Sequence, residues 1–161
     1  MMELYIRSFL LCYNLYDSRH RRLGKVRRDL WRKQRLRVYD AGGHPVCTVW
    51  QQGESACVSR DGELLFCRPF RHRTASGSRL RPPAAQSMEI PTPWGIFTLV
   101  QEEKRDFTLF QDARKVGEIR RMLSPVKELR LTSPQEEPAL FGGIVFSLAC
   151  LMLHDDDFET V

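Results

Sequence analysis

The chain has 161 residues, a length typical of one globular domain. Hydrophobic residues make up 42% of it and charged residues 28%, a balance that excludes wholesale disorder. The net charge of +5 is unevenly distributed, because residues 1–83 carry 17 Lys and Arg against 7 Asp and Glu, whereas residues 84–161 carry 8 against 13. We therefore expect one domain over residues 1–161, with a basic first half and an acidic second half.

The N-terminal segment and the cysteines predict a cytoplasmic protein. Glu3 stands where the basic region of a signal peptide belongs, and the apolar run after it covers only residues 9–12. The cysteines are odd in number and no two form a CxxC pair, so we interpret them as small buried hydrophobic residues in a reducing compartment. They are Cys12, Cys47, Cys57, Cys67 and Cys150.

A pattern of strand, turn and strand recurs along the chain. Apolar residues alternate up to an Asp, a turn follows, and a second alternating segment begins. Asp favours the entry to a turn because its carboxylate accepts hydrogen bonds from nearby backbone N–H groups. With similar alternation at residues 106–110, 116–123 and 126–132, we expect about ten short strands in an antiparallel meander, closed into a barrel or folded as a sandwich. The full pattern occurs at residues 15–26, 38–49, 59–67 and 109–119.

One long interruption falls at about residues 71–93. This segment is rich in Pro, Ser and Arg and has few large apolar residues, so it is predicted to be a flexible loop. It separates the strands into two groups and coincides with the change in charge. Each group alone would have a thin core, so we interpret the groups as two halves of one barrel.

The C-terminal segment departs from the strand pattern. Residues 139–153 contain no charged side chain, and Pro138 suits the first turn of a helix, so we predict a helix over about residues 138–153. At 1.5 Å per residue these 15 residues would span about 22 Å, which is short for a membrane core of about 30 Å. Its large apolar residues point in every direction, so the helix must be buried on all sides, which only a closed sheet can achieve. They are Leu140, Phe141, Ile144, Val145, Phe146, Leu148, Leu151, Met152 and Leu153.

These features together resemble a known superfamily. A β-barrel threaded by a C-terminal hydrophobic helix is the hallmark of the tubby C-terminal-like proteins, and the chain looks most like their LURP-one-related branch, distant kin of the phospholipid scramblases. The resemblance covers nearly the whole chain. It rests on the segments LYIRSFL, RLRVYDAGGHPVCTV, PWGIFTLVQEEKRDFTLFQDARKVGEI and EEPALFGGIVFSLACLMLHDDD, in that order.

The resemblance implies a barrel of about twelve antiparallel strands around the helix, with no firmly associated enzyme activity. Tubby domains bind phosphoinositide head groups through basic residues, and scramblases share the barrel. The chain departs from scramblases because it has no palmitoylation-type cysteine cluster and no acidic calcium loop before a long apolar tail. The acidic residues 154–158 follow the helix and supply too few oxygens for calcium alone, so we expect no metal site.

The densest charge lies between Arg19 and Arg37, where ten of nineteen residues are basic and Asp29 is the single acid. Such density can attract phosphate in lipid head groups or in nucleic acid. The alternative is that these residues only form the solvent-exposed face of a strand. Trp31 interrupts the run and could lie at a membrane interface, stack on a base or anchor a strand in the core. The candidate anion-binding residues are Arg19, Arg21, Arg22, Lys25, Arg27, Arg28, Arg32 and Lys33.

Catalytic patterns are lacking in the sequence. The four histidines, at positions 20, 44, 72 and 154, are scattered, without HExxH or zinc-ligand spacing. We therefore expect no catalytic residue and no cofactor. The predicted role is non-enzymatic binding or scaffolding, peripheral to a membrane, with an anionic lipid as the ligand and no transmembrane span. The alternatives are a nucleic-acid-associated protein that uses the same basic face, or a tail-anchored membrane protein.

Overall fold

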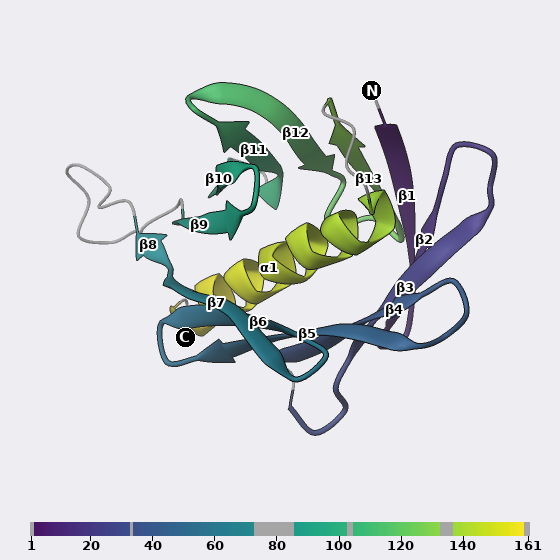
Figure 1. The fold of residues 1–161 in the computed structure, drawn as a ribbon, viewed down its shortest axis with the longest axis horizontal. Coiled ribbons are helices and arrows are strands. Elements are labelled where there is room, and N and C mark those ends of the chain that lie inside the picture. Colours follow the sequence, from purple (N-terminus) through teal and green to yellow (C-terminus); the bar gives the residue numbers. More distant parts are fainter. Residues whose placement is uncertain (1, 33, 73–85, 103–104, 133–136, 160–161) are drawn as a thin grey trace.

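The structure is a computed structural model that describes residues 2–32, 34–72, 86–102, 105–132 and 137–159. Within these ranges the chain forms thirteen β-strands and one α-helix. The strands belong to one antiparallel sheet that curls around the helix as a nearly closed barrel (Figure 1). The predicted fold class is confirmed, with a strand count close to the expected twelve.

The sheet is a meander in which each strand pairs with its neighbours in the sequence, except that β7 and β8 do not pair and β1 pairs with β13. The β1–β13 pairing joins the two halves of the chain into a single sheet. The strands are β1 (Met2–Phe9), β2 (Cys12–Tyr16), β3 (Arg22–Arg28), β4 (Arg35–Asp40), β5 (Pro45–Gln52), β6 (Ser55–Arg60), β7 (Glu63–Pro69), β8 (Arg71–His72), β9 (Gln86–Thr92), β10 (Gly95–Gln101), β11 (Phe107–Gln111), β12 (Arg114–Arg120) and β13 (Val126–Leu131).

One continuous segment supplies both edges of the sheet. β7 pairs with β6, the chain passes through the buried Phe70, and β8 then pairs with β9. The N–H of Phe70 donates to the carbonyl of Glu54 at 2.8 Å, which fixes the crossing point. No backbone pairing among the described residues joins β7 itself to β9. β7 and β9 therefore lie close together without pairing, and a cavity opens between them, which we call the seam.

The predicted Asp turns are present. Asp61 and Gly62 both have positive φ, 51° and 82°, as a tight hairpin turn between β6 and β7 requires. The Oδ1 of Asp40 accepts the backbone N–H of His44 at 2.9 Å in the turn between β4 and β5. This hydrogen bond is the main reason that the pKa of Asp40 lies below its usual value. The carboxylate thus stabilises the turn in the way that the sequence pattern implies.

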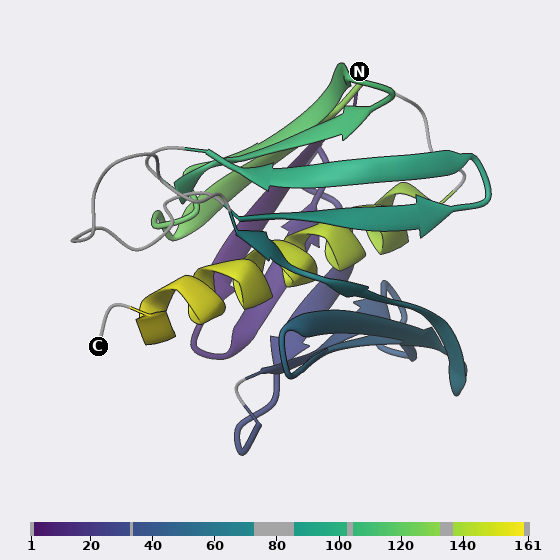
Figure 2. The same cartoon turned by 90° about the vertical axis from the view of Figure 1, so that its left-hand side faces the viewer.

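The helix α1 (Pro138–Glu159) runs through the barrel (Figure 2). It packs against β3, β4, β5 and β10. Its residues Val145, Phe146, Leu148, Ala149, Leu151 and Met152 are at most 1% exposed. The predicted burial on all sides is confirmed, and this burial does not support the tail-anchor alternative. No helix in the described part of the chain is long and apolar enough to cross a membrane.

The helix extends six residues past its predicted end at residue 153. The apolar stretch stops at Leu153, but no Gly or Pro follows to end the helix. The strands approach the helix closely at its glycines. A Cβ on Gly143 would lie 2.8 Å from Cγ1 of Val38, and one on Gly142 would lie 2.7 Å from Cδ1 of Leu4.

The predicted loop at residues 71–93 is partly wrong. Arg71–His72 forms β8 and Gln86–Thr92 forms β9, while residues 73–85 lie outside the described residues. In β9, Gln86, Met88 and Ile90 are buried and the residues between them are half-buried, the alternation of a strand. Pro91 and Pro93 concealed this pattern, because proline in a run argues against a strand except at an edge.

The prediction for the cysteines is wrong at one pair. Cys57 and Cys67 form a disulfide, and they are direct register partners in β6 and β7 with Cα atoms 4.1 Å apart. Sequence spacing alone did not reveal the pair because the hairpin register includes a bulge after Val58. Cys47 and Cys150 are free and buried, as predicted, and burial raises the pKa of each thiol to about 11.

Candidate anion-binding site

The eight predicted anion-binding residues do not form one cluster. They lie in the turn between β2 and β3, along β3, and in the connection between β3 and β4. Arg22 is the first residue of β3 and Arg28 the last, so the two are separated by roughly 20 Å at about 3.3 Å per residue. Lys33 lies outside the described residues. The others in chain order are Arg19, Arg21, Arg22, Lys25, Arg27, Arg28 and Arg32.

The group in the turn between β2 and β3 serves local structure. The Nε of Arg21 donates to Oδ2 of Asp17 at 2.9 Å, and the backbone N–H groups of Arg19 and Arg21 donate to Oδ1 at 2.9 Å. The backbone bond from Arg21 is the main cause that lowers the pKa of Asp17. Because Asp17 balances part of the charge here, this turn is the weaker candidate for binding an external anion.

The group on the outer face of β3 is joined by residues of β4. Arg27 lies directly opposite Arg37, and Lys25 lies opposite Tyr39 with its Nζ 4.9 Å from the ring centroid. Val26 between them is fully buried, so its neighbours project outward. Like charges directly opposite one another destabilise a sheet, and neither Arg27 nor Arg37 pairs with a carboxylate of the described residues. We call Lys25, Arg27, Arg37 and Tyr39 the basic outer face.

A small hollow of about 150 Å³ lies at one end of this face. It has the volume of roughly five waters at about 30 Å³ each, enough for a phosphate group. Three guanidinium groups and one carboxylate line it, so its charge favours an anion. Its lining residues are Arg27, Arg28, Asp29, Leu30, Arg37 and Tyr39.

Large apolar side chains are exposed beside this hollow. Leu30 is 64% exposed and Trp31 is 90% exposed in the connection between β3 and β4. Phe9 and Leu10 at the β1–β2 turn are 73% and 85% exposed, and Leu123 at the β12–β13 turn is 71% exposed. We call these five residues the apolar rim.

The apolar rim lies at the end of the barrel where α1 ends. A second hollow, of about 260 Å³, is lined by Leu10 and Leu123 of the rim and by Leu153 near the end of the helix. Figure 2 shows the β1–β2 turn (purple) beside that end of the helix (yellow). Arg28 lines both hollows, so the basic outer face and the rim adjoin. Exposed apolar patches of this kind mark protein or membrane contacts.

The second hollow contains further cations that lie outside the basic run of the sequence. Lys127 is 7% exposed, and its Nζ donates to Oγ of Ser8 at 2.8 Å and to the carbonyl of Ser124 at 2.6 Å. Burial lowers the pKa of this ammonium group. Arg105 lines the same hollow and has a positive φ of 63°. The order of the strands brings these residues to Arg28 from distant parts of the chain.

The comparisons with known proteins bear on the fold. No family model matches the sequence, and no curated protein matches it. A solved X-ray structure of a protein from Arabidopsis thaliana matches with a TM-score of 0.56 and 13% identity, over 96% of this chain and 91% of that one. That protein is LURP-one-related. This chain and that protein share one barrel fold. At such low identity the match establishes the architecture alone.

Within this barrel the described histidines do not form a reactive group. His44 is exposed in a turn, with its Nδ1 3.4 Å from Oδ1 of Asp40, and His20 is exposed with a positive φ of 62°. No group of three or more His, Cys, Asp or Glu residues in the described ranges could hold a metal ion. The candidate site is therefore the basic outer face together with the apolar rim.

Proposed function

We propose that this protein is a non-enzymatic binding module that docks on anionic membranes with the end of the barrel that carries the apolar rim. The observation that supports this most is the position of the rim beside Arg27 and Arg37. Trp and Leu on exposed turns enter the interfacial region of a bilayer, while flanking arginines contact lipid phosphates. The opposed arginines of the basic outer face would be relieved of their repulsion by a phosphate between them.

The expected free energy of membrane binding is sufficient for reversible docking. Each Lys or Arg close to an anionic membrane contributes about 1 kcal/mol, so Arg27, Arg32 and Arg37 supply about 3 kcal/mol. Insertion of Leu30 and Trp31 adds apolar burial at about 25 cal/mol per Å². The sum reaches the range of about 4–8 kcal/mol that corresponds to millimolar to micromolar affinity. Either contribution alone would be marginal.

Nucleic acid is the second candidate for the same cations. Trp31 could stack on a base, and arginines could contact the phosphate backbone. The aliphatic members of the rim, Leu10, Leu30 and Leu123, favour the membrane because they offer no stacking surface to a base. A lipid surface uses all five residues of the rim.

The test is sedimentation with vesicles of phosphatidylcholine alone and of phosphatidylcholine with phosphatidylserine, over a series of salt concentrations. Binding should require the anionic lipid and weaken with salt. The variant Arg27→Glu with Arg37→Glu should lose at least about tenfold in affinity, since each reversal removes an attraction and adds a repulsion. Leu30→Ser with Trp31→Ser should also weaken binding while the salt dependence remains.

The matched control is Arg19→Glu with Arg22→Glu, which makes the same charge change at the other end of β3. It should bind acidic vesicles nearly as well as the parent. Equal losses in both double variants would show that only net charge matters and would contradict docking by the rim. Tighter retention of a single-stranded oligonucleotide than of acidic vesicles would favour the nucleic-acid alternative.

A further inference from the structure

The seam between β7 and β9 contains a large cavity. It has a volume of about 490 Å³ and opens to solvent on one side. Pockets that take small molecules typically measure about 300–1,000 Å³. The cavity adjoins the beginning of α1, whereas the apolar rim adjoins its end, so it is separate from the candidate anion-binding site.

The walls of the cavity are apolar. Leu65 and Phe66 of β7 form one side, Ile90 of β9 the other, and Phe141 and Ile144 of α1 the floor. Leu65 is 50% exposed, so it stands at the open side. The buried thiol of Cys47 also faces the cavity, and its raised pKa keeps it neutral. Such walls bind through apolar contact, and the charged lining residues, Arg60 and Glu137, lie at the mouth.

Trp94 stands at the mouth in a turn that is held by hydrogen bonds. Its N–H donates to Oγ1 of Thr92 at 3.2 Å, and its carbonyl accepts from Nε2 of Gln111 at 3.1 Å. The Oγ1 of Thr92 in turn donates to the carbonyl of Gly95 at 2.7 Å. The indole is 57% exposed, so a large aromatic side chain is held in position with more than half of its surface in water.

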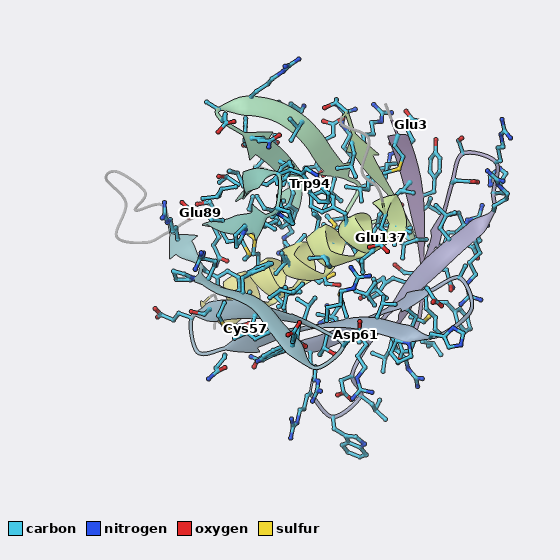
Figure 3. The ribbon with its side chains drawn as sticks, viewed as in Figure 1. Glu3, Cys57, Asp61, Glu89, Trp94 and Glu137 are labelled. Atoms are coloured by element: carbon cyan, nitrogen blue, oxygen red, sulfur yellow. A yellow bond between two sulfur atoms is a disulfide. The ribbon has the colours of Figure 1, made fainter. Side chains whose placement is uncertain are left out.

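The charges at the mouth cancel. Nη1 and Nη2 of Arg60 lie 3.1 and 3.3 Å from the two carboxylate oxygens of Glu137, a bidentate pair between β6 and the residue before α1. Figure 3 labels Glu137 and Trp94, both of which line the cavity. An anionic head group would be repelled by Glu137 and a cationic one by Arg60, whereas a hydroxyl can donate to Glu137 and accept from Arg60. The mouth therefore favours an uncharged polar group.

The edges of the seam do not suit an added peptide strand. β9 contains Pro91 and is followed by Pro93, and β7 ends at Pro69. Proline has no N–H to donate to an incoming strand, and natural edge strands use it to block such pairing. The occupant must then bind by apolar contact rather than by backbone hydrogen bonds.

We propose that the seam cavity binds one aliphatic chain of an uncharged single-chain amphiphile, such as a fatty alcohol or a monoacylglycerol, with its hydroxyl head at the Arg60–Glu137 pair. The chain lies between Leu65, Ile90 and Ile144, and Trp94 covers it. This inference does not depend on membrane docking by the apolar rim, because the two sites share no residue.

The experiment uses a protein in which Trp94 is the single tryptophan, made by Trp31→Phe and Trp50→Phe. Titration with a bromine-labelled fatty alcohol should quench the Trp94 emission to saturation, because bromine quenches indole only at close contact. Unlabelled dodecanol should reverse the quenching. Dodecanoate and dodecyltrimethylammonium, which carry charged heads on the same chain, should bind at least about tenfold more weakly, a difference of about 1.4 kcal/mol.

The variants Leu65→Asp and Leu64→Asp form a matched pair. Both residues are at least half exposed on β7, but only Leu65 lines the cavity. Leu65→Asp should raise the dissociation constant for dodecanol at least about tenfold, and Leu64→Asp should change it less than about twofold. Leu140→Phe, which fills the cavity from α1 without adding a second tryptophan, should abolish saturable quenching in a protein with the parent's circular dichroism. An absence of quenching in the parent, equal effects of the two Asp variants, or tighter binding of dodecanoate would each overturn the proposal.

Discussion

The hydroxyl of Ser147 donates a hydrogen bond to the carbonyl oxygen of Gly143 one turn earlier in α1, at 2.7 Å. Ser147 is fully buried. Because this polar side chain is satisfied within the helix, the surrounding strands need to supply no polar partner. The centre of the barrel therefore has no place for a charge.

The first prediction follows from this contact. Ser147→Asp should abolish cooperative folding, because an unpaired buried carboxylate costs more than the net stability of about 5–15 kcal/mol that a typical domain has. Circular dichroism and size-exclusion chromatography measure the outcome. Ser147→Ala is the control and should change the free energy of unfolding by only about 1 kcal/mol, since one local hydrogen bond is lost. A soluble Ser147→Asp protein with the parent's melting temperature would contradict the burial of α1.

The fold could be predicted because its central element has an unambiguous pattern. A helix that is apolar on every side must be enclosed, and Gly143 against Val38 shows how closely the strands approach it. The same reasoning failed at β9, where the buried Met88 and Ile90 alternate correctly but Pro91 obscures the pattern. The prolines at this edge block added strands, which is a property of the sheet that no local window of sequence contains.

The candidate site could be predicted only in part. Charge density along the chain identified Arg27, but its cross-strand partner Arg37 and the distant Lys127 depend on register and on which turns meet at one end of the barrel. Density also grouped Arg19 with Arg27, although β3 separates them. The hairpin alternation of residues 35–39 was the available signal for Arg37, because it placed that residue on the outer face.

The second prediction concerns the opposition of Arg27 and Arg37. Arg37→Glu should raise the free energy of unfolding by about 0.2–1 kcal/mol, because a repulsive cross-strand pair becomes an attractive one. The same change should weaken binding to acidic vesicles. Urea denaturation and vesicle sedimentation measure the two effects. Arg114→Glu, at the exposed start of β12, is the control and should leave both unchanged within error. A loss of stability in Arg37→Glu would show that the two guanidinium groups do not repel one another.

The third prediction concerns the buried thiols of Cys47 and Cys150. Burial raises the pKa of each to about 11, above the ordinary value of 9.0. Between these two values the unfolded chain releases the thiol protons while the folded protein keeps them. The contribution of the two buried thiols to stability is therefore complete below pH 9.0 and is lost as the pH rises to about 11. At 1.36 kcal/mol per pH unit the loss is roughly 3 kcal/mol for the fully buried Cys150 and smaller for Cys47, which faces the open seam cavity.

Urea denaturation between pH 7 and pH 11 tests this prediction. It compares the free energy of unfolding of the parent with that of a variant that carries Cys47→Ala and Cys150→Ala. The variant should have a lower free energy of unfolding at pH 7, because it loses buried sulfur atoms. The difference from the parent should shrink as the pH rises through the window. A constant difference would mean that the two thiols titrate alike in the folded and unfolded states and are therefore exposed in the folded protein.

The last prediction concerns Lys127, whose ammonium group is buried between Ser8, Ser124 and the ring of Tyr13. Burial lowers its pKa below the ordinary 10.5, so the unfolded chain holds this proton more tightly than the folded protein does. Stability from this group therefore rises with pH between the lowered value and 10.5, the opposite sign to the thiols.

Lys127→Met removes the titration of this group and keeps most of the side-chain volume. Relative to the parent, this variant should lose stability progressively as the pH rises towards 10.5. It should also bind acidic vesicles more weakly at pH 7, since one cation of the docking end is gone. Chemical denaturation over that pH range measures the first effect and sedimentation the second. A difference in stability that does not vary with pH would show that Lys127 titrates as it does in water, and its ammonium group would then be solvated rather than enclosed.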